Sequence, residues 1–138
     1  MKYVIDSCVA VKWAIAEGDT DKALRIRDDF RAGLVELIAP DVFPVEFIHA
    51  VTRAERQGRV LPDEGAELVG DLFATLPQLL NSLPLLPRAY ELSSQMRIGV
   101  YDCLYVALAE REQCDLLTAD QRLVSVFRAY RVIALSSL

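Results

Sequence analysis

The chain has 138 residues, of which 53% are hydrophobic and 25% are charged, with a net charge of −5 at pH 7. This length and composition fit one compact domain, which we expect to span residues 1–138. The acidic balance argues against a protein that holds naked nucleic acid over its whole surface, and no apolar run reaches membrane-spanning length. Asp6 interrupts any N-terminal signal sequence and the three cysteines lack paired spacing, so we expect a cytoplasmic protein.

The first half of the chain alternates between strand-like and helix-like segments. A β-prone run ends at Asp6, and the next residues are apolar at helical spacing. Gly33 and Gly58 each close a later helix. We expect, in order, a strand at 3–5, a helix at 9–16, a helix at 19–33, a strand at 35–39 and a helix at 43–58.

The second half continues the alternation. Pro62 opens an amphipathic helix, and a later stretch, 103–109, is apolar all round, which indicates a helix in the middle of the domain. The helix after Pro62 should have a buried face of Leu68, Val69, Leu72, Phe73 and Leu76. We then expect a short strand at 83–86, a helix at 87–98, the apolar helix at 103–109, a strand at 116–118, a helix capped by Asp120 and a strand at 132–134.

Repeated strand and helix units predict an α/β fold. The central sheet should be mostly parallel, with helices on both faces, which makes three layers. In such folds ligands gather at the carboxyl ends of the strands. The residues that follow each strand are therefore the first place to look for a functional site.

Four acidic residues stand at or near such places: Asp6, Glu46, Asp102 and Asp120. Asp6 and Asp120 follow predicted strands, and Asp102 lies at the positive pole of the apolar helix. Glu46 lies beside the apolar stripe of its helix. Each aspartate alone fits a helix N-cap, and Glu46 alone fits the rim of a surface helix. Carboxylates that converge at one edge repel one another unless a cation lies between them, which predicts a metal site.

Four segments carry a resemblance to a known family. They are VIDSCV at 4–9, PVE at 44–46, YDCLYVALA at 101–109 and LTAD at 117–120. In this order, and across nearly the whole chain, they closely resemble the PIN-domain nucleases, and within them the VapC-type ribonuclease toxins of prokaryotic toxin–antitoxin pairs. The resemblance implies a PIN-like three-layer fold. It also implies a catalytic quartet with two supporting hydroxyls: Asp6, Glu46, Asp102 and Asp120, then Ser7 and Thr118.

The chemistry of these residues suits metal-dependent hydrolysis of RNA. Carboxylate oxygens are hard ligands, which Mg²⁺ or Mn²⁺ prefers, and such ions leave open positions for water and phosphate. We expect Asp6, Asp102 and Asp120 to bind the metal and Glu46 to bind it directly or through water. Ser7 and Thr118 would orient ligands, although a turn or capping hydroxyl is the simpler role for each. The family implies a 5′-phosphate product.

Three further residues are candidates for substrate contact. His49, the only histidine, lies three residues after Glu46, where the family often has asparagine. Lys12 and Arg53 could meet RNA phosphates near the cleft. The simpler interpretation is a structural histidine and a solvated helix face.

Other classes of protein share the alternating pattern. A receiver domain needs an acidic pair after the first strand and a lysine near the last, and a haloacid-dehalogenase phosphatase needs Asp-x-Asp in the first motif. Ser7 and Cys8 follow Asp6, so both fail. The remaining alternative is a catalytically inactive PIN-like module that binds RNA or a protein.

The resemblance also implies partners. A toxin of this kind would have RNA as its substrate and a small cognate antitoxin protein that docks near the cleft. An arginine from the antitoxin could compete with the metal for the carboxylates. Family members often form homodimers, and the exposed side of the 68–76 helix is a candidate surface.

Overall fold

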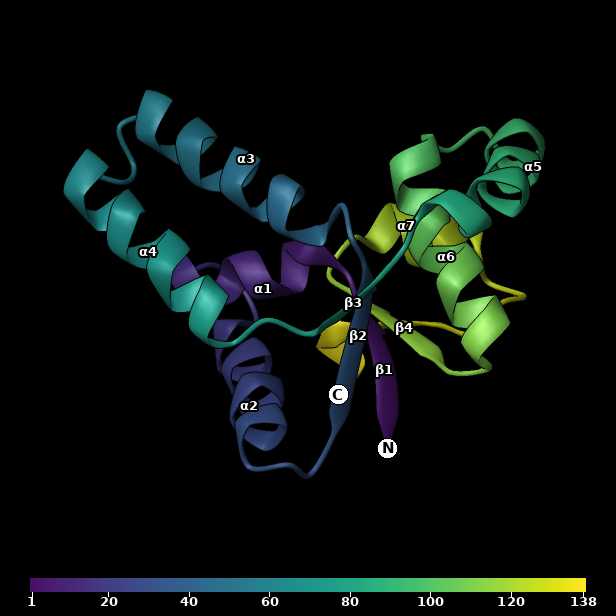
Figure 1. Cartoon of the computed structure of the whole chain (residues 1–138), viewed down its shortest axis with the longest axis horizontal. Coiled ribbons are helices and arrows are strands. Elements are labelled where there is room, and N and C mark those ends of the chain that lie inside the picture. Colours follow the sequence, from purple (N-terminus) through teal and green to yellow (C-terminus); the bar gives the residue numbers. More distant parts are fainter.

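The computed structural model describes all 138 residues, which form a five-stranded parallel sheet between layers of helices (Figure 1). The strands lie in the order β3-β2-β1-β4-β5. They are β1 (Lys2–Ile5), β2 (Glu36–Pro40), β3 (Gln78–Leu80), β4 (Asp115–Thr118) and β5 (Val132–Ala134). The helices are α1 (Ser7–Ala14), α2 (Thr20–Arg31), α3 (Phe43–Arg56), α4 (Pro62–Ala74), α5 (Leu86–Met96), α6 (Val100–Glu112) and α7 (Gln121–Val126). The predicted α/β fold is confirmed.

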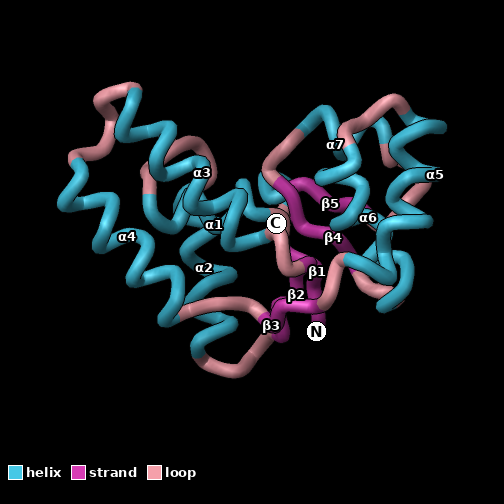
Figure 2. Tube along the Cα trace, turned by 45° about the horizontal axis from the view of Figure 1, so that its top comes forward, coloured by secondary structure: helices cyan, strands magenta, loops and turns pink.

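The order of the strands explains the layers. From β1 the chain moves outward through β2 to β3, then returns to β4 on the other side of β1 and continues to β5. Because crossovers between parallel strands are right-handed, this reversal sends the helices of the two halves to opposite faces. Figures 1 and 2 show α1 to α4 on one side of the sheet and α5 to α7 on the other.

Helix α6 is the central helix of the fold, as its apolar composition predicts. Residues 103–109 are all buried, and α6 packs on β1, β2 and β4 on one side and on α5 on the other. Its apolar surface therefore faces protein in every direction. Neither α6, with 13 residues, nor any other helix has the length and hydropathy needed to cross a bilayer.

The register of the central strands positions the edge where a ligand would bind. Ile5 pairs with Leu117, and the backbone N–H of Asp6 donates to the carbonyl of Leu117 at 3.0 Å. The chain segments that leave β1 and β4 therefore begin side by side. This is the point where the strand order reverses, which is where ligands generally bind in open α/β sheets.

One predicted strand is wrong. Residues 83–85 form a short 3-10 turn, and Leu86 already begins α5. Pro84 explains the difference, because it has no N–H to donate to a strand ladder but fits the first turn of a helix. The third strand lies earlier, at Gln78–Leu80, and pairs with β2. With only three residues, this edge strand has too short a pattern to be recognised.

Two expectations about helices also need correction. Phe73 does not belong to a buried face, because it is 56% exposed while its neighbour Leu72 is 3% exposed. Helix α4 packs mainly on α3 rather than on the sheet, so only a narrow stripe of it is covered. Asp102 does not precede α6 but lies in its first turn, since the helix begins at Val100 with Gly99 as its N-cap.

Candidate active site

The four predicted acids come from four separate elements and face one edge of the sheet. Asp6 follows β1, and Asp120 lies two residues after β4. Glu46 and Asp102 lie in the first turns of α3 and α6. The charges of Asp6 and Asp120 raise the pKa of Asp102, and those of Asp6 and Asp102 raise the pKa of Glu46, in each case after the larger effect of burial. The acids are therefore close enough to repel one another.

Asp6 is the most buried of the four, with 5% of its surface exposed. Burial raises the pKa of its carboxyl, and the charge of Asp120 adds to this, while a hydrogen bond from Thr118 opposes it. Asp6 occupies the N-cap position of α1, yet its side chain makes no capping hydrogen bond. A helix cap therefore does not account for this aspartate.

Thr118, the last residue of β4, connects two of the acids. Its side chain is fully buried, and its hydroxyl donates to Oδ2 of Asp6 at 2.8 Å. The hydroxyl oxygen of Thr118 in turn accepts a hydrogen bond from the backbone N–H of Asp120 at 3.1 Å. This geometry combines both interpretations of Thr118, a turn hydroxyl and a support for the first carboxylate.

Glu46 is held through one of its two oxygens. The hydroxyl of Tyr105 donates to Oε1 at 2.6 Å, and that of Ser7 donates to the same oxygen at 3.4 Å. Tyr105 is fully buried on α6, and its own pKa is raised well above its ordinary value, so it remains a neutral donor. Sequence reasoning missed Tyr105, although a phenol in an apolar helix needs a hydrogen-bond partner and this was the available signal.

Asp102 and Asp120 share a guanidinium that the sequence analysis also missed. Nη2 of Arg122 lies 3.3 Å from Oδ2 of Asp102 and 3.8 Å from Oδ2 of Asp120. Burial, and then the charges of Asp6 and Asp120, raise the pKa of Asp102 to about 6, while Arg122 opposes the rise. Asp120 also caps α7, because its Oδ1 accepts from the backbone N–H groups of Arg122 and Leu123 at 2.9 and 3.3 Å.

The donor set fits a hard divalent cation in its chemistry, since every side chain in it offers oxygen. In this arrangement, however, no three acidic, histidine or cysteine side chains are gathered closely enough to hold a metal ion. Arg122 supplies positive charge between Asp102 and Asp120 instead, and Thr118 holds Asp6.

The three candidates for substrate contact lie in different surroundings. The ammonium of Lys12 pairs with Glu17 at 3.4 Å and with none of the four acids. Arg53 is exposed on α3 and makes no ion pair. His49 is exposed and lies beside Glu46, where both residues line the same hollow.

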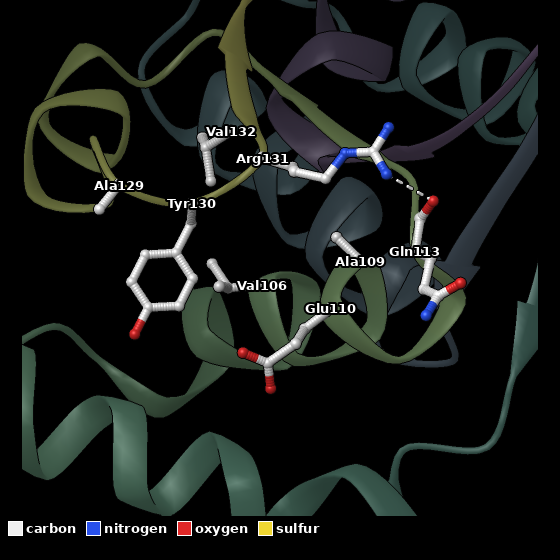
Figure 3. A pocket seen from close by; sticks show the side chains of 8 residues that line it. All are labelled: Val106, Ala109, Glu110, Gln113, Ala129, Tyr130, Arg131 and Val132. Atoms are coloured by element: carbon white, nitrogen blue, oxygen red, sulfur yellow. Dashed lines mark hydrogen bonds between the residues drawn. The ribbon is translucent and has the colours of Figure 1, made fainter.

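A second hollow, of about 520 Å³, lies away from the acids (Figure 3). It opens between the second half of α6 and the segment that leads into β5, and Tyr130 and Glu110 point into it (Figure 3). None of the four acids lines this hollow. This hollow is therefore separate from the acidic edge of the sheet.

Comparison with known proteins places the chain in a family. The model of the PIN domain matches residues 3–128. Ribonuclease VapC1 of Mycobacterium tuberculosis is 34% identical over 128 residues, which cover 88% of this chain and 91% of that protein. The chain therefore belongs to the PIN-domain family and, within it, to the VapC ribonucleases, as its motifs predict.

Solved structures agree with this fold. PAE2754 from Pyrobaculum aerophilum superposes with a TM-score of 0.72 at 19% identity, covering 99% of this chain and 94% of that one. VapBC2 from Rickettsia felis, solved with a DNA fragment from its promoter, gives a TM-score of 0.68 at 16% identity, covering 97% and 98%. At these identities the likeness concerns the fold alone.

Proposed function

We propose that this protein is a metal-dependent endoribonuclease that hydrolyses phosphodiester bonds in RNA and acts as the toxin of a toxin–antitoxin pair. The observation that carries the proposal is the convergence of four carboxylates at one edge of the sheet, two that follow β1 and β4 and two in the first turns of α3 and α6. Burying mutually repelling acids costs stability, so a fold that keeps them together needs them for another purpose. Membership of the VapC ribonucleases supports the same chemistry.

The proposed ligands of the metal are Asp6, Asp102 and Asp120, with Glu46 binding directly or through water. Bound Mg²⁺ or Mn²⁺ would supply positive charge that lowers the pKa of the attacking water and neutralises charge on the phosphate. Thr118 fixes the orientation of Asp6 through its 2.8 Å hydrogen bond. Such hydrogen bonds to a ligand keep it ready to bind and limit its motion.

Glu46 is proposed to accept a proton from the attacking water. Tyr105 and Ser7 both donate to Oε1, which leaves Oε2 without a protein hydrogen bond. That oxygen can accept a proton from water as the water oxygen attacks phosphorus. The bond from phosphorus to the 3′ oxygen breaks, the departing oxygen takes up a proton, and the products are a 5′-phosphate and a 3′-hydroxyl.

We also propose partners and a compartment. The Rickettsia felis relative was solved as VapBC2, which supports a cognate antitoxin protein for this chain. We expect a homodimer formed through the exposed side of α4, where Phe73 is 56% exposed. Because the proposed substrate is RNA and all three cysteines are free thiols, we expect the protein to act in the cytoplasm.

The test is cleavage of structured and unstructured RNA by protein freed of any partner. We expect cleavage with Mg²⁺ or Mn²⁺ and none in EDTA, with recovery when metal is added back. Products should carry a 5′-phosphate, which ligation or phosphatase treatment detects. Cleavage that persists in EDTA would contradict the metal-dependent site, and no cleavage of any RNA would favour an inactive binding module of the same fold.

Arg122 gives a prediction about metal binding that does not depend on activity. Because its guanidinium lies against Asp102 and Asp120, removing it should free both acids for a cation. We expect Arg122→Gln to bind Mn²⁺ about two- to fivefold more tightly, since exposed ion pairs of this kind are weak. Titration calorimetry measures this directly. Arg128→Gln, which removes another exposed arginine, should leave the affinity unchanged; equal affinities for the two variants would show that Arg122 does not compete.

A further inference from the structure

A hollow of about 500 Å³ opens beside Glu46, between the first turn of α3 and the first turn of α6. It is lined by Ser7, Val45, Glu46, His49 and Tyr101. Two of these residues, Ser7 and Glu46, are hydrogen-bonded to each other. The hollow is thus continuous with the catalytic edge, and whatever occupies it lies next to the reacting phosphate.

The lining combines exposed apolar surface with an acidic border. Tyr101 is 60% exposed and Val45 is 68% exposed, although they come from different helices. A single exposed apolar side chain is ordinary in a folded protein. Two of them that line one hollow form an apolar surface on which a flat, uncharged ring can pack. No lysine or arginine lines the hollow to hold a phosphate. The chemistry of the hollow therefore suits a nucleobase and not the charged backbone.

The exposed face of α3 continues from this hollow. Glu46, His49, Arg53 and Arg56 follow one another at spacings of three or four residues, so they share one face of the helix. Both arginines are exposed, and neither makes an ion pair with an acidic side chain. Arg53 lies seven residues beyond Glu46, roughly 10 Å along the helix axis. An RNA backbone leaving the hollow along α3 would meet unpaired positive charge there.

We propose that this hollow is a nucleobase subsite for the nucleotide next to the cleaved phosphate. Tyr101 stacks on the base, Val45 packs against its edge, and the ring of His49 offers a hydrogen bond to the base or the ribose. The RNA backbone then runs along α3 past Arg53. This subsite rests on the proposed ribonuclease function, and it assigns the hollow a specific part of a single-stranded RNA substrate.

The test measures both binding and cleavage of a single-stranded RNA oligonucleotide. Binding is measured by fluorescence anisotropy in EDTA, and cleavage in Mn²⁺. We expect Tyr101→Ala to weaken binding and raise KM about tenfold, with a smaller effect on kcat. Tyr101→Phe keeps the aromatic face and should stay within about twofold of wild type. Tyr90→Ala, at a tyrosine 70% exposed on α5, is the matched control and should behave as wild type.

The outcomes separate the subsite from the proposed function. If wild type cleaves and Tyr101→Ala matches Tyr90→Ala in both measurements, the subsite is overturned and the ribonuclease stands. If wild type binds the RNA through Tyr101 but cleaves nothing, the ribonuclease is overturned, and the hollow stands as a base-binding site of an RNA-binding module without a cleaved phosphate beside it. If the RNA neither binds nor is cleaved, both are overturned.

Discussion

Replacing Asp6 or Asp102 by asparagine is expected to reduce RNA cleavage by at least about a hundredfold while the fold stays intact. Changing a residue that only orients a metal ligand costs up to about a hundredfold in affinity or activity, so changing a proposed ligand should cost more. Asparagine has the shape of aspartate, and the hydroxyl of Thr118 can still donate to its amide oxygen at position 6. What the substitution removes is the negative charge.

The control for this experiment lies on a strand that reaches the same site. Asp115 begins β4, at the end of the strand opposite to Thr118, and it pairs with Arg131 at 2.9 Å. Asp115→Asn removes the same charge by the same substitution and should keep activity close to that of wild type. Circular dichroism and thermal melts of all four proteins establish that they are folded.

Two results would contradict the assignment. If Asp6→Asn and Asp102→Asn cleave as wild type does, the activity comes from another site or from a contaminating nuclease. If Asp115→Asn is as inactive as the other two, general loss of charge explains the effect and the quartet has no special role.

The sequence predicted the helices and strands correctly where a hydrophobic pattern extends over many residues. The apolar run at 103–109 correctly predicted a helix in the middle of the domain, because a helix that is apolar all round must be covered on every side. The exception was β3, whose three residues give no period to detect. The apolar run that contains Pro84 predicts a strand at 83–86 instead, although proline favours the first turn of a helix.

The sequence predicted the four acids of the candidate site but not the side chains that form hydrogen bonds or ion pairs with them. Asp6 and Asp120 could be placed together because both follow strands of one parallel sheet. Tyr105 and Arg122 could not, because a hydrogen bond from a buried phenol and an ion pair from an exposed arginine depend on side-chain positions that no periodicity encodes. Lys12 lies in the last turn of α1 and pairs with Glu17, which sequence spacing alone did not reveal.

The acidic cluster should also make the metal-free protein less stable at neutral pH than at acidic pH, as far as these groups are concerned. The pKa of Asp102 is raised from 3.8 to about 6 in the folded protein, chiefly by burial. The folded state therefore holds this proton more tightly than the unfolded chain does. The resulting stability is complete below pH 3.8 and is lost as the pH rises through about 6. Such a shift corresponds to ~3 kcal/mol, an upper bound because water reaches the side chain.

Asp102→Asn removes this titration and should therefore abolish the loss of stability that Asp102 causes at neutral pH. At pH 7.5 in EDTA we expect the variant to have a larger free energy of unfolding than wild type, by up to ~3 kcal/mol, and at pH 4 the difference should be small. Urea unfolding at the two pH values measures it. Glu67→Gln, which removes an exposed charge on α4, should show no such dependence on pH.

Divalent metal should cancel the larger free energy of unfolding that we expect for Asp102→Asn. A cation that binds the folded wild type stabilises it by mass action, whereas Asp102→Asn has lost one of the proposed ligands and gains less. At pH 7.5 we therefore expect Mn²⁺ to raise the unfolding free energy of wild type more than that of the variant. Equal gains for both proteins would show that Asp102 is not a ligand of the metal, and a difference between the two proteins that does not change with pH would show that ionised Asp102 does not destabilise the fold.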